Sequence, residues 1–363
     1  MTVIRNLILY IVMLGVIVTL YELGHLTAAK IFGVYCKEFS FGFGPKLLSY
    51  KRKETEYCLR AIPLGGFVAM AGDSDNNLET KVEIEDLPPE RTLTGIAKWK
   101  RAIIMMAGIL MNILLAVAIY SLMILSSGTY AKSTKPEIVM VKEDSPALKA
   151  GLREGDIINH VEFENGLGLS PDTYLELMNF LEVYDGNGPW ILTIDRDGSI
   201  LTVNVQPEFV EEEGRYMVGI GFSNKAVEAV KVNILNCWKY GFEFTVFILK
   251  LTFSSLMSLF KGKNLDSLSG PIGIYSTVSQ TANLGFEYYL QLIAMVSVNV
   301  GIVNALPLPI FDGGRVLLLL IEQIIGKPLS EKAQNAVMSV SLAILLLLFL
   351  LVMYNDISRI IGG

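Results

Sequence analysis

Four apolar stretches of this chain are long enough to be considered as membrane spans, which need about 20 mostly apolar residues. Ala102–Leu125 is uncharged, and Asn112 is its only amide. Ala336–Tyr354 is also uncharged and is flanked by charged residues on both sides. These two stretches predict ordinary transmembrane helices.

The other two apolar stretches carry polar groups at their ends. Leu7–Leu20 runs directly into Tyr21, Glu22 and His25, and Tyr288–Ile310 ends in a proline-rich sequence that is followed by an aspartate. Ionisable groups at membrane depth are costly, so they indicate a functional site. A cleavable signal peptide is the alternative interpretation of the N-terminus, but a glutamate and a histidine would interrupt its apolar core.

Basic residues indicate the orientation in the membrane. They follow the first stretch and precede the second, at Lys30, Lys37, Lys46, Lys51, Arg52, Lys53, Lys98, Lys100 and Arg101. Arg5 and Arg359 are the corresponding basic residues near the two ends of the chain. Because cytoplasmic loops are enriched in Lys and Arg, we expect the first loop in the cytoplasm and both termini outside.

The region between the second and third stretches has the alternating pattern of a soluble, strand-rich domain. Its predicted strands are Pro136–Val141, Asp156–Val161, Ile191–Arg196 and Ile200–Val205, with a helix at Asp172–Glu182. Residues 145–152, Ser-Pro-Ala-Leu-Lys-Ala-Gly-Leu, and the following Gly155–Ile158 resemble PDZ modules of bacterial proteases. Such modules bind extended peptides at a sheet edge. His160 lies in a predicted strand, and we interpret it as an ordinary strand residue.

Val230–Phe260 is rich in aromatic residues and places its charged residues on one face. This pattern favours an amphipathic helix at the membrane surface over a fifth span. The alternative is that this helix packs against the PDZ-like module.

Composition agrees with a membrane protein. The 363 residues are 52% hydrophobic, the mean hydropathy is positive, and the formal net charge is −6. No extended basic run offers a surface for phosphates, which argues against a nucleic-acid partner. The three cysteines, at positions 36, 58 and 237, lack C-x-x-C spacing and indicate neither a disulfide framework nor a thiolate metal site.

Candidate chemistry begins in the first stretch. Tyr21-Glu22-Leu23-Gly24-His25 takes the place of an H-E-x-x-H helix, whose first and last residues face one metal while the glutamate is the general base. The first histidine of that pattern is missing here. The position of the sequence inside an apolar span strengthens the interpretation.

A second polar segment, Asn304-Ala305-Leu306-Pro307-Leu308-Pro309-Ile310-Phe311-Asp312-Gly313-Gly314, resembles the N-x-x-P-x-P-x-L-D-G signature of site-2 proteases. The sequences Gly270-Pro271-Ile272-Gly273 and Ile62–Val68, and Gly108 with Asn112, are also similar to the bacterial branch that processes anti-sigma factors. The resemblance covers nearly the whole chain and identifies it as a member of the bacterial site-2 protease family, with one PDZ domain.

The resemblance implies roles for individual residues. His25 and Asp312 would bind zinc, and Glu22 would act as general base. Asn304 would bind the substrate backbone or the developing oxyanion. Asn112, Pro307 and Pro309 would help to bind the substrate; the prolines also interrupt a helix, which membrane proteins tolerate where the backbone lines a cavity.

Tyr21 departs from the family pattern. A phenol has a reference pKa near 10 and must lose its proton before it binds a metal, so zinc affinity should fall. A pseudoprotease, an active enzyme with an unusual ligand and a deliberate inactivating substitution remain alternative explanations. We expect activity to be absent or strongly reduced, because three good ligands and an open position are usual for catalytic zinc.

Lys46–Lys53 and Tyr57–Ile62 flank Glu54-Thr55-Glu56 and predict a hairpin, which resembles the membrane-associated β region of the family. Its edge could pair with an unwound substrate. The alternative is a solvated hairpin without a catalytic role.

The predicted fold is a membrane α-helical protein with four transmembrane helices, a membrane-associated β region and an inserted α+β PDZ-like domain. The segments are the first helix (1–32), a cytoplasmic loop (33–98), the second helix (99–127), the extracytoplasmic PDZ-like domain (128–228), the amphipathic helix (229–265), the third segment (266–325), and the fourth helix with the tail (326–363).

The predicted function is intramembrane proteolysis of transmembrane segments in the bacterial inner membrane, with zinc as cofactor and with anti-sigma factors or signal peptides as substrates. The alternative function is a catalytically inactive adaptor that binds transmembrane helices without cutting them. A transporter with broken helices is disfavoured because no inverted repeat is visible.

Overall fold

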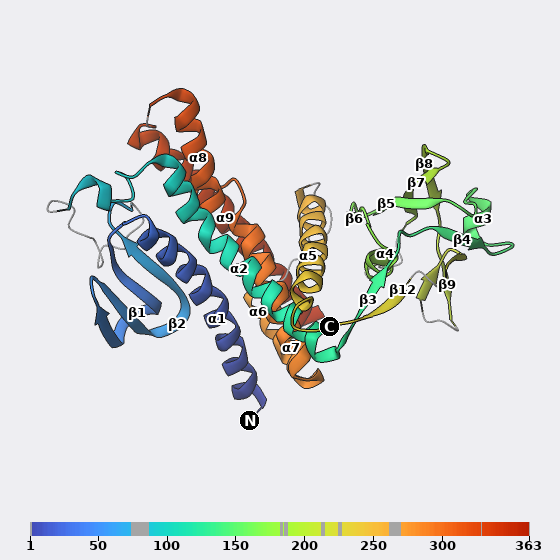
Figure 1. The fold of residues 1–363 in the computed structure, drawn as a ribbon, viewed down its shortest axis with the longest axis horizontal. Helices are drawn as coiled ribbons and strands as arrows, with labels where there is room; N and C mark the ends of the chain where they lie inside the picture. The colour runs from blue at the N-terminus through green and yellow to red at the C-terminus, as the bar shows by residue number, and fades with distance from the viewer. Residues whose placement is uncertain are drawn as a thin grey trace. The chain divides into compact units, whose positions relative to one another are not determined.

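The computed structural model describes residues 2–362 apart from 74–86, 182–183, 185–187, 212–214, 224–226, 261–269 and 328 (Figure 1). The chain divides into two compact units. Unit 1 comprises Met1–Ile119 and Ser269–Gly363, and unit 2 comprises Tyr120–Leu268. Unit 2 is therefore inserted, in the sequence, between two parts of unit 1.

Most of unit 1 is helical. Its helices are α1 (Thr2–Ile31), α2 (Lys98–Ser127, which continues into unit 2), α6 (Pro271–Leu284), α7 (Phe286–Asn304), α8 (Asp312–Ile325) and α9 (Glu331–Gly362), with a short 3₁₀ turn at Pro89–Arg91. Five helices of the described chain are long and apolar enough to cross a membrane, namely α1, α2, α7, α9 and α5 (Cys237–Phe260) of unit 2. The chain is thus a helical membrane protein with an additional β region.

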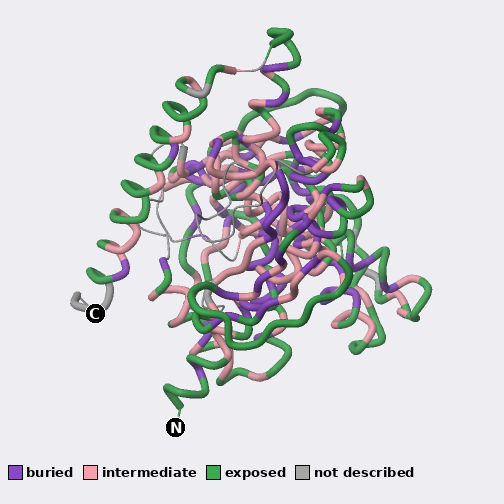
Figure 2. Tube along the Cα trace, turned by 90° about the vertical axis from the view of Figure 1, so that its left-hand side faces the viewer, coloured by how far each residue is buried: buried purple, intermediate pink, exposed green. Residues whose placement is uncertain are grey.

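The C-terminal helix α9 turns most of its apolar side chains outward. In the most apolar part of this helix only 6% of the residues are buried, against 33% for α2 and 44% for α7. Figure 2 shows most of the helix that leads to the C-terminus as exposed or half-buried. Leu347 and Leu350 are among its exposed residues. Exposed leucines on a long apolar helix are expected where lipid is the solvent.

The β region of unit 1 is a hairpin of two long, bent strands, β1 (Cys36–Arg52) and β2 (Thr55–Met70). The bends give residues 38–41 two sets of partners, one at 66–69 and the other at 56–59. The turn between the strands passes through Lys53, which has a left-handed backbone (φ 53°). The predicted hairpin is confirmed and extends beyond both of its predicted ends.

Residues 266–325, which the sequence analysis treated as one segment, contain three helices. Gly285, whose φ of 137° is unfavourable for other residues, separates α6 from α7. Helix α7 ends at Asn304, and α8 begins at Asp312 after the two prolines. Gly313 lets the start of α8 pack against the preceding chain, because a Cβ there would lie 2.8 Å from the Cα of Ala305.

Unit 2 is an α+β module. Its four-stranded sheet has the order β6-β5-β7-β8, and the other described strands of the unit form the pairs β3–β12, β4–β11 and β9–β10. The elements are β3 (Thr129–Ser133), β4 (Ile138–Val141), α3 (Pro146–Lys149), β5 (Ile157–Phe163), β6 (Gly168–Leu169), α4 (Tyr174–Leu181), β7 (Trp190–Arg196), β8 (Ser199–Val205), β9 (Glu208–Val210), β10 (Arg215–Met217), β11 (Ile220–Phe222) and β12 (Val227–Lys231). The four predicted strands and the predicted helix are all present.

Helix α5 packs against the strands of unit 2, as the alternative in the sequence analysis predicted. Phe247 is buried in the core of this unit. Ser254 accepts a hydrogen bond from the Gly168 amide at 3.0 Å, and Ser258 donates one to the Asn165 carbonyl at 3.0 Å. The location of α5 at a membrane surface stays a prediction.

Candidate active site

Helix α1 presents three polar side chains to one side of unit 1. Tyr21 and His25 are four residues apart and Glu22 and His25 three apart, spacings that place side chains on one helical face. The rings of Tyr21 and His25 meet edge to face, with centroids 4.7 Å apart at 85°. His25 is 7% exposed, so its polar atoms depend on protein partners or a ligand.

The structure brings the two distant polar segments together at Asp312. The carboxylate Oδ2 lies 3.3 Å from His25 Nε2 and also accepts a hydrogen bond from the Tyr21 hydroxyl. Asp312 is the first residue of α8 and is 291 positions from Tyr21. The three residues that the sequence analysis grouped at a metal site therefore converge on one point.

The other ring nitrogen of His25 is bonded to the backbone. Nδ1 lies 2.8 Å from the carbonyl oxygen of Ile104 in α2. Because a carbonyl can only accept, Nδ1 carries a proton, and in the neutral ring Nε2 then presents a lone pair to Asp312. Two acceptors that face each other at this distance need a shared cation, either a proton on the imidazole or a metal ion.

Small residues let α2 approach α1 at this point. A Cβ on Gly108 would lie 2.8 Å from both His25 Cε1 and Tyr21 Cε2. A Cβ on Gly24 would lie 2.8 Å from the carbonyl carbon of Ala107. The two glycines thus create the space that the polar side chains of α1 occupy.

A cavity of about 280 Å³ lies beside this cluster. Helices α1, α2, α7 and α8, strand β2 and three connecting segments (after β2, before α2 and between α7 and α8) line this cavity. The lining residues are Tyr21, Glu22, His25, Phe67, Val68, Met70, Asp73, Leu93, Ile104, Met105, Asn304, Ile310, Asp312 and Arg315. Glu22 and Asn304 therefore share one cavity with the convergent point. Strand β2 passes close to Glu22, since a Cβ on Gly66 would be 3.5 Å from its Cγ.

Two charged residues that the sequence analysis missed line the same cavity. Arg315 Nη1 lies 3.7 Å from Asp73 Oδ1, and the two side chains are 25% and 12% exposed. Burial raises the pKa of Asp73, and the nearby Arg315 opposes this rise. The position of Arg315 three residues after Asp312, on the same helical face, was the available signal.

Asn112, Pro307 and Pro309, which were predicted to bind substrate, do not line this cavity. Asn112 is fully buried, and its backbone carbonyl accepts a 2.9 Å hydrogen bond from Ser297 of α7. Its side-chain amide has no hydrogen-bond partner among the described residues. The prolines lie between α7 and α8, where they set the break that places Asp312.

The donor atoms at the convergent point suit a divalent metal of the zinc type. Ligand atoms 2.0–2.1 Å from a tetrahedral zinc ion lie roughly 3.3 Å apart, which matches the distance from His25 Nε2 to Asp312 Oδ2. An imidazole whose other nitrogen donates to a carbonyl is the usual arrangement of a metal-binding histidine. Tyr21 would offer a third donor atom, its phenol oxygen, once the phenol has lost its proton.

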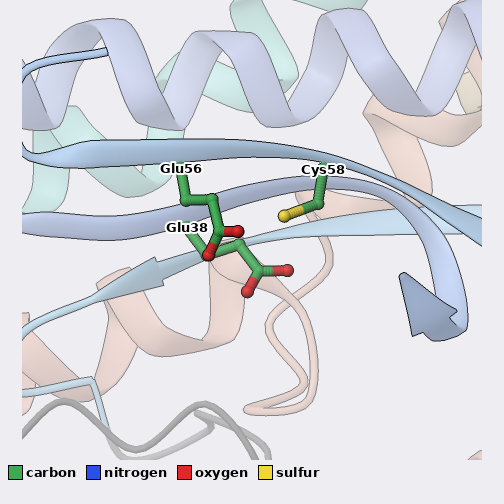
Figure 3. A group of neighbouring side chains, drawn as sticks. All are labelled: Glu38, Glu56 and Cys58. Carbon is green, nitrogen blue, oxygen red and sulfur yellow. The ribbon is translucent and has the colours of Figure 1, made fainter. Parts of the chain in front are cut away.

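A second group of ligand-type residues lies in the hairpin, at Glu38, Glu56 and Cys58 (Figure 3). Lys46 Nζ already occupies the space between the carboxylates, 2.9 Å from Glu38 and 2.7 Å from Glu56. Arg60 donates to Glu38 at 2.8 Å. Burial raises the pKa of the Cys58 thiol to about 11. This group is thus a neutral ion-pair network with its own cations, and it holds the bent strands together.

Comparison with known proteins defines the class. The cavity gathers Glu22 and His25 from α1 and Asp312 from α8. The model of peptidase family M50 matches residues 9–348, and the chain belongs to this family.

Several known proteins are similar to this chain over nearly the whole length of both sequences. The regulator of sigma-W protease RasP of Bacillus subtilis is 30% identical, over 98% of this chain and 99% of that protein. A putative zinc metalloprotease of Clostridium perfringens is 35% identical, over 94% of this chain and 95% of that protein. Another from Clostridium acetobutylicum is 33% identical, over 97% of each chain.

Proposed function

We propose that this chain is a site-2-type intramembrane zinc endopeptidase whose activity is impaired by Tyr21. The observation that carries this proposal is the approach of His25 Nε2 to Asp312 Oδ2, at 3.3 Å, in a cavity that Glu22 also lines. We propose His25 and Asp312 as zinc ligands and Tyr21 as a weak third ligand. Relatives are named zinc metalloproteases, which supports this choice of metal.

The proposed peptide hydrolysis assigns a separate role to the metal and to each of a few side chains. Zinc, when bound, supplies a Lewis acid that polarises the scissile carbonyl and makes a nearby water more acidic. The Glu22 carboxylate accepts a proton from the attacking water and passes it to the leaving amine. The Asn304 amide, at the end of α7, donates a hydrogen bond to the substrate backbone or to the developing oxyanion. The Ile104 carbonyl holds His25 in the tautomer that leaves Nε2 free.

The substrate is proposed to be a transmembrane segment that unwinds along β2. A helix bonds its own carbonyls, so a scissile peptide must leave the helix before it is attacked. Phe67, Val68 and Met70 of β2 line the cavity. Pairing of an extended segment with this strand supplies backbone hydrogen bonds in place of those lost on unwinding. Anti-sigma factors are one substrate class, because one relative is named as a regulator of sigma-W protease.

Unit 2 is proposed to be a PDZ-like module that filters substrates by size. A groove of about 500 Å³ is lined by α4 residues Tyr174, Met178 and Leu181 and by residues 215–222. Strand β11 at this groove pairs with β4. An extended peptide could add to this sheet, as peptides do in strand-addition modules. The proposed setting is the bacterial inner membrane, crossed four times, with both termini and unit 2 outside.

Tyr21 favours a second candidate function, an inactive adaptor that binds transmembrane segments without cutting them. Its hydroxyl donates to the Asp312 carboxylate and so engages one proposed zinc ligand. A neutral phenol is also a poorer ligand than the imidazole of the family pattern. The two candidates share the same cavity and differ in whether it holds metal.

Zinc content and cleavage test the proposal. The full chain and its Tyr21→His variant are purified in detergent, zinc per chain is measured by mass spectrometry, and cleavage of a transmembrane reporter is followed in liposomes. We expect Tyr21→His to hold about one zinc and to cleave, and the parent to hold less and to cleave more slowly. Adding Glu22→Gln to Tyr21→His should keep the metal and reduce cleavage by roughly 10²–10⁴-fold.

Two results would contradict the proposal. One is a Tyr21→His variant that holds no zinc, and the other is cleavage that persists in the presence of Glu22→Gln. A parent chain that retains the reporter, holds no zinc and does not cut it would favour the adaptor.

A further inference from the structure

The Asp73–Arg315 ion pair joins the β region to the helix that begins with Asp312. Asp73 follows β2, and Arg315 lies in the first turn of α8. Their charged groups are 3.7 Å apart, and both side chains are mostly buried in the cavity wall. Neither residue is part of the chemistry proposed above.

The Asp73 end of this ion pair is held firmly by the scaffold. The Asp73 amide donates to the Met70 carbonyl at 3.3 Å. On the same short segment, the Ala71 amide donates to Tyr35 at 2.9 Å, and the Ala71 carbonyl accepts from Leu93 at 2.7 Å. Gly72 has a left-handed backbone (φ 79°) and no room for a side chain, since a Cβ would be 2.8 Å from Thr94 Oγ1. The backbone that carries Asp73 is therefore held in place by these contacts.

The Arg315 end lies in the first turn of α8. Phe311, at the N-cap of α8, makes no side-chain capping hydrogen bond. Gly313 and Gly314 pack closely against the preceding chain, since a Cβ on Gly313 would lie 2.8 Å from the Cα of Ala305 and one on Gly314 would meet the backbone of Leu308. Asp312 and Arg315 are three residues apart on one face, so the rotation that points Arg315 at Asp73 also points Asp312 at His25. The same rotation satisfies both contacts.

We propose that Arg315, held by Asp73, is a positioning residue that sets the rotation of α8 and thereby aims Asp312 at His25. This inference rests on the proposed function, because it gives Asp312 the role of a zinc ligand. The charge of Arg315 has a second effect in the same place: Glu22 and Asp73 both lie in its field. Arg315 therefore lowers the repulsion among the carboxylates that surround the proposed metal.

Hydrogen exchange of the metal-free full chain tests the positioning directly. Peptides that cover residues 311–320 are followed by mass spectrometry in the parent, Arg315→Gln, Asp73→Asn, Arg315→Lys and the swap Asp73→Arg with Arg315→Asp. Loss of a partly buried ion pair should speed exchange in this turn roughly fivefold. Arg315→Lys and the swap should remain close to the parent.

Arg91→Gln is the matched control, since Arg91 pairs with Glu54 near the hairpin turn and does not line the cavity. It should leave exchange of residues 311–320 unchanged. Equal exchange in the parent, Arg315→Gln and Asp73→Asn would overturn the inference. A swap that exchanges as fast as the single variants would do so as well, because charge pairing would then not be the cause.

Zinc affinity in the Tyr21→His background gives the second measurement. Arg315→Gln and Asp73→Asn should each raise the dissociation constant roughly 10–100-fold, the usual cost of losing an outer partner of a metal ligand. Faster exchange with unchanged zinc affinity would contradict the positioning role. If Tyr21→His itself holds no zinc, the proposed function fails, and the exchange data decide on their own whether the ion pair sets α8.

Discussion

Two clusters of charged residues in the described part of unit 1 differ in their balance of positive and negative charge. In the hairpin, Glu38 and Glu56 face Lys46 and Arg60, so two acids meet two bases at hydrogen-bonding distances. In the cavity the acids are Glu22, Asp73 and Asp312, and Arg315 is the base that stays charged when His25 is neutral.

This difference indicates what each cluster does. A closed network satisfies its own charges and specifies the local fold. The cavity, with three carboxylates and one guanidinium, has a deficit of two positive charges if all three acids are ionised. A divalent cation between Asp312 and His25 would supply this charge, whereas burying such an imbalance without a partner is costly. The charge imbalance therefore supports the proposal that the cavity binds a cation, whereas the balanced hairpin cluster is a structural ion-pair network.

The largest expected effect is on the balanced cluster. Glu38→Gln leaves the Arg60 guanidinium buried without its charged partner, since the two residues are 2% and 7% exposed. Removing one partner of a buried pair costs about 3–5 kcal/mol. We expect this loss in the free energy of unfolding, measured by denaturant titration in detergent, with zinc affinity of the folded Tyr21→His background unchanged.

Lys46→Met is the control within the same cluster. The Lys46 side chain is 39% exposed, so its ion pairs should contribute less than about 1 kcal/mol. If Glu38→Gln were as stable as the parent, the hairpin cluster would not be the structural network described above.

The second largest effect is expected on zinc affinity, at the cavity cluster, whose charges are unbalanced. Tyr21→His should raise zinc affinity roughly 100-fold or more, since a direct ligand should matter at least as much as an outer partner. The phenol must release a proton on binding, so affinity of the parent should rise more steeply with pH between 7 and 9 than affinity of the histidine variant. Competition with a chelating dye measures both quantities.

Tyr21→Phe separates two roles of the phenol. If the Tyr21 oxygen is a ligand, the phenylalanine variant should bind zinc more weakly than the parent. Equal affinity of the two would show that His25 and Asp312 hold the metal without help from position 21.

A smaller effect on stability and zinc affinity is expected at the contact between α1 and α2, where Gly108 faces His25 and Tyr21. Gly108→Ala would force His25 and Tyr21 away from α2 and cost about 1–3 kcal/mol, the usual penalty for overpacking. Zinc affinity in the Tyr21→His background should fall with it. Gly301→Ala is the control, because its Cβ would be 3.7 Å from its nearest neighbours, an ordinary contact. Similar zinc affinities for the two alanine variants would contradict the role given to Gly108.

The sequence predicted the elements with a strong local signal. The apolar runs of α1, α2 and α9 and the alternating strands of unit 2 were visible because burial in lipid or in a sheet core imposes a regular pattern. The family motifs also led to His25 and Asp312, although their approach depends on contacts between residues almost 300 positions apart.

Other features of the structure were missed or differ from the prediction. Helix α8 was not predicted as a separate helix, because it begins beyond the proline-rich end of the third apolar stretch. The Asp73–Arg315 pair was missed because its members lie in different motifs and meet only through the packing of the hairpin beside α8. Asn112 was predicted to bind substrate because it sits in a motif, but the structure buries its side chain against α7, outside the cavity.

The smallest expected effect is at Asn112. Its amide makes no hydrogen bond within the described part of the chain, so replacing it with the similarly sized leucine removes a buried polar group without breaking a contact. We expect Asn112→Leu to keep or raise the free energy of unfolding, by up to about 1 kcal/mol. Cleavage in the Tyr21→His background should stay within roughly twofold, because a residue outside the cavity does not touch the reacting groups.

Ser297→Ala is the matched variant, since it removes the donor to the Asn112 carbonyl on the facing helix. Hydrogen bonds between membrane helices contribute about 0.6 kcal/mol on average, so a small loss of stability is expected there. Asn112→Leu would instead return the residue to the substrate path if it lowered cleavage while stability stayed constant. In that case the substrate must separate α2 from α7 to reach the Asn112 amide. The substrate-binding region of unit 1 would then extend beyond the cavity that Glu22 lines.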